Sequence, residues 1–128
     1  MLTYVVTGFI YLVFGTLLLP LNLLGMLIFD RDAIFLIWFF GFVVMMVFGI
    51  PYVFIPGFSR SKFVNPNLGY TEYILLNIGI IFLFISIAGF LQYIFILYVA
   101  TLFLIISVLI HSINMWNMVF FRKKSKIK

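Results

Sequence analysis

Apolar residues fill most of the chain in long runs, and short polar segments separate these runs. The polar segments are residues 30–32, a longer stretch at about residues 59–72, and the basic end of the chain. A helix needs about 20 apolar residues to cross the hydrocarbon core of a bilayer. The pattern therefore predicts membrane-spanning helices joined by short loops.

The lengths of the apolar runs predict four spans in one domain. The last two share an uncharged stretch, residues 73–121, which is too long for one helix, and the turn-like residues 89–93 place the re-entry within it. The expected fold class is all-α, a polytopic four-helix membrane bundle. Its expected parts are helices at about 4–29, 33–58, 72–90 and 93–121 and a basic cytoplasmic tail at 122–128.

Local signals add detail to these helices. We expect Asp32 to cap the second helix and Glu72 to lie in the first turn of the third, where a carboxylate faces the positive end of the helix dipole. Pro51 predicts a kink or a helix end near residues 49–51, and Pro20 allows a tilt or a kink, because proline lacks a backbone donor and crowds the preceding turn.

Small residues recur at helical spacing and predict close contacts between helices. Residues 37–56 carry a stripe of small and aromatic positions and form the expected organising helix of the bundle. Small side chains let neighbouring helices approach, which is a main source of attraction between helices in lipid. The predicted packing residues are Gly8, Gly15, Gly41, Gly49, Gly79 and Ser86.

Composition and charge agree with a membrane protein. Hydrophobic residues make up 66% and charged residues 9% of the chain, whereas soluble domains carry about 25% charged residues. The absence of cysteine excludes disulfides and thiolate sites. The net charge of +5 does not indicate nucleic-acid binding, because most basic residues adjoin an apolar helix. The residues expected to set topology and contact anionic lipid headgroups are Arg122, Lys123, Lys124, Lys126 and Lys128.

The distribution of basic residues also predicts orientation. With both termini in the cytoplasm, Arg60, Lys62 and the five basic tail residues lie inside, and only Arg31 lies outside. We expect a multi-pass protein of a prokaryotic plasma membrane.

His111 is the candidate cofactor-binding residue. It shares a helical stripe with Ser107 and Asn114, about 16 Å along the helix from Arg122. An ionisable side chain there suggests a heme ligand, a proton relay or a quinone contact. We favour a neutral imidazole bonded to a Ser, an Asn or a backbone carbonyl of a neighbouring helix, because no second histidine or membrane-embedded carboxylate is expected. No catalytic or metal-binding residue is predicted.

One segment resembles a known family. The segment of about residues 35–80 is similar to a helix-loop-helix segment of the heme-copper oxidase subunit I-like superfamily, including its short four-helix members. The similar positions are Gly41, Phe48, Gly49, Tyr52, Pro56, Leu76, Asn77, Ile78 and Gly79. Leu36 and Val53 stand where the family has metal-ligand histidines, and neither can ligate iron or copper. The resemblance therefore implies a scaffold without the metal centre.

These observations favour a non-catalytic integral membrane subunit of a respiratory or oxidoreductase-type complex, with a structural or assembly role. Its expected partners are other membrane subunits and lipids. One alternative is a b-type heme protein that uses His111 from two chains of a dimer, or His111 with Met45. The other is a small transporter or channel, for which the chain offers few polar residues to line a path.

Overall fold

The computed structural model describes residues 2–26, 30–59, 66–89 and 94–120. These residues form helices α1 (Leu2–Leu23), α2 (Arg31–Leu36), η1 (Ile37–Val44), α3 (Met45–Ser59), α4 (Pro66–Ile87) and α5 (Ile94–Phe120). Helices α2, η1 and α3 follow one another without a break and make one long rod. The predicted basic tail and most of the predicted re-entry at residues 89–93 lie outside the described residues.

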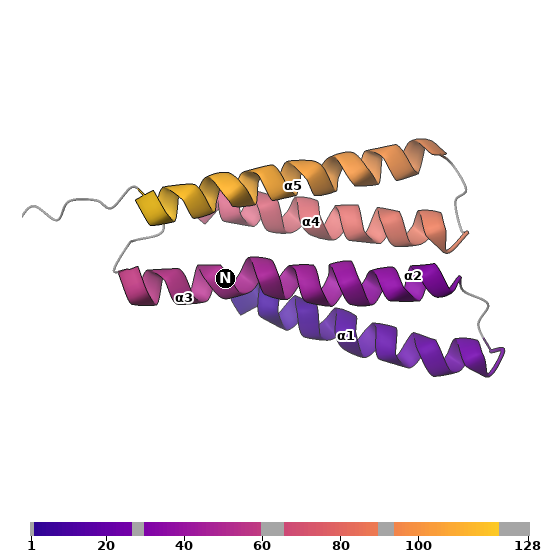
Figure 1. Ribbon diagram of the computed structural model, residues 1–128. Coiled ribbons are helices and arrows are strands. Elements are labelled where there is room, and N and C mark those ends of the chain that lie inside the picture. The colour runs from indigo at the N-terminus through magenta and orange to yellow at the C-terminus, as the bar shows by residue number, and fades with distance from the viewer. Residues whose placement is uncertain (1, 27–29, 60–65, 90–93, 121–128) are drawn as a thin grey trace, which may run out of the picture.

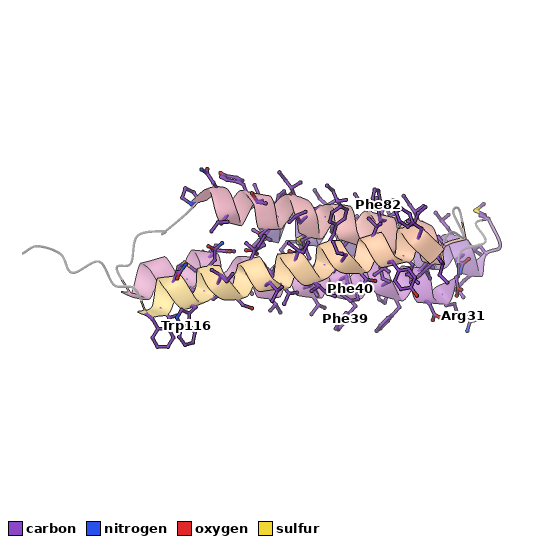
Figure 2. All side chains as sticks on the ribbon, turned by 90° about the horizontal axis from the view of Figure 1, so that it is seen from above. Arg31, Phe39, Phe40, Phe82 and Trp116 are labelled. Atoms are coloured by element: carbon purple, nitrogen blue, oxygen red, sulfur yellow. The ribbon has the colours of Figure 1, made fainter. Side chains whose placement is uncertain are left out.

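The predicted all-α four-helix bundle is confirmed. Four helical segments are long and apolar enough to cross a membrane, namely Leu2–Leu23, Arg31–Ile55, Pro66–Ile87 and Ile94–Phe120. Figure 1 shows two antiparallel hairpins, with α1 beside the α2–η1–α3 rod and α4 beside α5. The start of α1 and the end of α5 lie toward the same end of the bundle, and Figure 2 places Arg31 and Trp116 at opposite ends. Orientation in the membrane stays a prediction.

Two helix ends differ from the expected ones by six residues, and the others by three or fewer. The first helix ends at Leu23 and not near residue 29, because Gly25 takes a φ of 73°, the left-handed conformation that terminates helices. The third begins at Pro66, six residues before the expected start, since proline suits the first position of a helix. Glu72 therefore lies beyond the first turn of α4, contrary to the prediction.

One further local prediction is corrected, and the kinks expected at two prolines stay predictions. The cap of α2 is Asp30, whose side chain accepts a hydrogen bond from the backbone nitrogen of Asp32 at 3.2 Å. The second span contains the π-helix η1, and α3 continues through Pro51, so the helix does not end there and the kink stays a prediction. Helix α1 likewise continues past Pro20 to Leu23.

Five of the six predicted packing residues lie at contacts between helices. A Cβ atom added to Gly49 would lie 2.6 Å from Cβ of Tyr4, and one added to Gly41 would lie 2.7 Å from Cβ of Tyr11. Gly8 and Gly15 face the same rod, and Gly79 faces Leu104 on α5. The sixth, Ser86, is half-buried. Glycine thus brings α1 close to η1 and α3, and α4 close to α5.

This packing predicts the effect of enlarging Gly49. In Gly49→Ala, the new methyl group meets Cβ of Tyr4, which cannot rotate away, so α1 and α3 must separate at a cost of about 1 to 3 kcal/mol. Unfolding in detergent micelles, followed by circular dichroism, measures this loss. Ser112→Ala is the control, since Ser112 is exposed and bonds only the Val108 carbonyl of its own helix. If Gly49→Ala were as stable as Ser112→Ala, the close contact between Gly49 and Tyr4 would be contradicted.

Candidate functional site

Glu72 on α4 is the centre of the most polar region of the interior. Its side chain is 0% exposed although it is a carboxylate, and it lies six residues, about 9 Å, from the first residue of α4. Burying a carboxylate is costly unless its oxygens receive hydrogen bonds. The packing of α1, α3 and α5 around Glu72 supplies those bonds.

Two tyrosines hold the carboxylate oxygens. The Tyr4 hydroxyl on α1 donates to Oε1 at 2.9 Å and also lies 3.1 Å from the Gly69 carbonyl oxygen. The Tyr52 hydroxyl on α3 donates to Oε2. Both tyrosines are almost fully buried, and their rings stack with centroids 5.7 Å apart. Each hydroxyl therefore reaches Glu72 from the opposite hairpin.

His111 on α5 completes the contacts of the carboxylate. Its Nδ1 lies 2.9 Å from Oε1 of Glu72, and its side chain is 12% exposed. Phe48 stacks on the imidazole, with ring planes 8° apart and centroids 4.1 Å apart. The expected hydrogen-bonded imidazole is present, but its partner is a carboxylate and not a Ser, an Asn or a backbone carbonyl. We name Glu72, His111, Tyr4 and Tyr52 the carboxylate cluster.

Two more residues of α5 form hydrogen bonds with members of the carboxylate cluster. The Ser107 hydroxyl donates to the backbone carbonyl of Glu72 at 3.1 Å, and the Asn114 amide donates to the Tyr52 hydroxyl at 3.0 Å. The predicted stripe on this helix is confirmed, because Ala100, Ser107, Asn114 and Met118 are its buried residues. This stripe aims His111 toward α4.

A second set of polar contacts runs along α1 and α4 from the cluster. Thr7 and Tyr73 share a hydrogen bond of 2.6 Å between their hydroxyl oxygens. The Tyr11 hydroxyl donates to Oδ1 of Asn77 at 2.9 Å, and the Asn77 amide donates to the Tyr73 carbonyl at 2.9 Å. Together with Tyr4, these residues extend the polar interior about two turns further along α1.

The cluster can hold a proton in two places. Over the 2.9 Å contact, the proton can lie on Nδ1 of His111, opposite an ionised Glu72, or on Oε1, opposite a neutral imidazole. The tyrosine hydroxyls donate to the carboxyl group and Phe48 covers the imidazole, so both groups are held in place. The arrangement suits transfer of a proton between the two side chains.

Sequence reasoning identified His111 and missed Glu72. The error came from placing residue 72 at a helix start beside a loop, where a carboxylate is solvated. The signal that was available is Pro66, which marks an earlier start and moves Glu72 into the span.

Metal binding has no support in the described residues, which contain no group of three or more His, Cys, Asp or Glu side chains. No cofactor is predicted, and heme b at His111 stays an alternative. With Nδ1 bonded to Glu72, Nε2 of His111 would be the nitrogen that could hold a heme iron.

The cluster predicts a large difference between two substitutions of Glu72. Glu72→Leu removes the carboxyl group that Tyr4, Tyr52 and His111 share in an apolar interior and should lower the free energy of unfolding by about 3 to 5 kcal/mol. Glu72→Gln keeps an acceptor oxygen and should lower the free energy of unfolding by less than Glu72→Leu does. Denaturant unfolding in micelles measures both, with the exposed Asp32→Leu as the control. Equal losses in the two Glu72 variants would argue against a hydrogen-bonded cluster.

Comparisons with known proteins identify no relative: no protein-family model, no curated protein and no solved structure matches the chain. The resemblance of residues 35–80 to the heme-copper oxidase subunit I-like superfamily therefore stays a prediction.

Proposed function

We propose that this protein moves protons within the membrane, as a small transporter or channel, with Glu72 and His111 as its proton-binding pair. The supporting observation is that a fully buried carboxyl group in one apolar helix makes hydrogen bonds with side chains of the three other spans. Ionisable side chains inside membrane helices are costly and usually mark ion paths or proton relays.

The chemistry requires only a proton. When a proton arrives, the pair passes from carboxylate and neutral imidazole to a form in which one of the two groups has gained it. When the proton leaves, the reverse change follows. Tyr4 and Tyr52 keep the carboxyl oxygens in place during both steps, because their hydroxyls rotate easily between donating and accepting.

The structure changes which of the functions considered from the sequence has the best support. The chain has few polar residues for a path, yet its fold gathers many of them into one interior region. That region contains Tyr4, Thr7, Tyr11, Tyr52, Glu72, Tyr73, Asn77, Ser107, His111 and Asn114. A small transporter or channel therefore becomes the leading proposal.

Proton flux into liposomes tests this function. A potassium gradient with valinomycin drives the flux, and a pH-sensitive dye inside the vesicles reports it. Glu72→Gln has nearly the shape of the native side chain and cannot exchange an acid proton, so we expect its flux to fall at least about tenfold. Asp32→Asn makes the same chemical change at an exposed position and should keep the wild-type flux. Wild-type flux in Glu72→Gln would refute the proposal.

A second proposal is the non-catalytic subunit of a larger respiratory or oxidoreductase-type membrane complex. The observation that favours it is a shallow hollow on the outer face of α1. Only apolar residues line it, namely Val6, Phe9, Ile10, Val13, Phe14 and Leu17. A hollow of this kind accepts the side chains of a neighbouring helix, as contacts between subunits in a membrane require.

Purification from native membranes in mild detergent tests the subunit proposal. The chain should migrate with other integral membrane proteins, and Val13→Trp, which fills the hollow, should weaken that association without lowering stability. Leu102→Trp, on the exposed face of α5, is the control. Migration of the wild-type chain as a lone small species would contradict this proposal and leave the proton proposal standing.

A further inference from the structure

We propose that protons travel between the carboxylate cluster and the far half of the bundle along a polar ladder between α1 and α4. The ladder consists of Tyr4, Thr7 and Tyr11 on α1 with Tyr73 and Asn77 on α4. This inference rests on the proton-moving function proposed above, and it adds the route and the residues that form it.

The residues of the ladder lie on the faces of α1 and α4 that contact each other, and each contact between the two helices is a rung. Tyr4, Thr7 and Tyr11 are separated by three and four residues, so they share one face of α1 over about 10 Å. The Tyr4 and Tyr73 rings meet edge to face, with centroids 5.0 Å apart. Tyr73 then bonds Thr7, and Tyr11 bonds Asn77 one turn further on. Each rung crosses from one hairpin to the other.

A buried donor continues the ladder beyond Tyr11. Gly41 packs against Tyr11, and Gly15, one turn along α1, packs against the indole of Trp38. The Trp38 Nε1 is buried and has no hydrogen-bond acceptor among the described residues. Buried N–H groups are almost always paired, often with internal water. A water molecule held by Trp38 would carry the polar path about one more turn toward the end where α2 begins.

Within the hydrogen-bonded pair of Thr7 and Tyr73, one hydroxyl oxygen accepts a proton as it releases its own, so one O–H bond forms as another breaks. Tyr4 meets Tyr73 through the rings, and Tyr11 donates to the Asn77 amide, so the steps from Tyr4 to Tyr73 and from Tyr73 to Tyr11 would pass through a bridging water molecule by the same exchange. No electron moves, and water is the only other molecule that takes part. Thr7 and the three tyrosines, Tyr4, Tyr11 and Tyr73, carry hydroxyls able to do this, while Asn77 and Trp38 position the groups next to them.

The hydroxyl groups can be removed with little change of shape. Thr7→Val and Tyr11→Phe each delete one oxygen, and Tyr11→Phe keeps the ring that packs on Gly41. In the liposome flux assay we expect both to reduce proton flux at least about fivefold. Thr7→Ser, which restores the hydroxyl, should return the flux to near the wild-type value. Thr16→Val is the control, because Thr16 is exposed on the same helix and bonds only the Leu12 carbonyl.

The outcomes distinguish a failure of the proposed route from a failure of the proposed proton-moving function. Loss of flux in Thr7→Val and Tyr11→Phe, with recovery in Thr7→Ser, supports the ladder. Wild-type flux in both deletion variants, together with loss in Glu72→Gln, overturns the ladder and leaves the proton function intact. Wild-type flux in Glu72→Gln overturns the function itself. Circular dichroism of each variant identifies a folding defect, and Tyr11→Phe decides the question if Thr7→Val fails to fold.

Discussion

The hydrogen bonding of one buried carboxylate organises the contacts between the two hairpins. In hydrocarbon the carboxylate of Glu72 would be strongly unfavourable alone, so Tyr4, Tyr52 and His111 must stay in place around it. The bonds from Tyr4 on α1 and Tyr52 on α3 cross to Glu72 and fix how the hairpins meet, whereas His111 on α5 holds the carboxylate from within its own hairpin. Apolar contacts cannot do this alone, because lipid offers side chains nearly the same environment as a neighbouring helix.

Glycine and the polar cluster have complementary roles in this fold. Within the first hairpin, Gly8, Gly15, Gly41 and Gly49 let the α1 backbone approach η1 and α3 closely. Between the hairpins, long side chains span a wider separation, and tyrosine is suited to this because its rigid ring carries a hydroxyl at its far end. Close backbone packing thus builds each hairpin, and directional hydrogen bonds join the two.

The proposed functions make different use of the same features. A proton path needs Glu72 and His111 to change protonation while their neighbours hold position, which the tyrosines and Phe48 provide. A structural subunit needs a stable bundle with an apolar outer surface, which the hollow on α1 provides. The two roles are compatible in one protein, because they use opposite sides of α1.

Much of the fold follows from the sequence, because the length of an apolar run and the spacing of small residues are local properties. They predicted four helices, five of the glycines at which helices come close, and the buried face of α5 that carries His111. The partner of His111 was beyond such reasoning. Tyr4 and Glu72 are 68 positions apart and Glu72 and His111 39 apart, and no local pattern records which side chains meet across a bundle. The helix start at Pro66 placed Glu72 inside the span, and the packing of the hairpins then decided its partners.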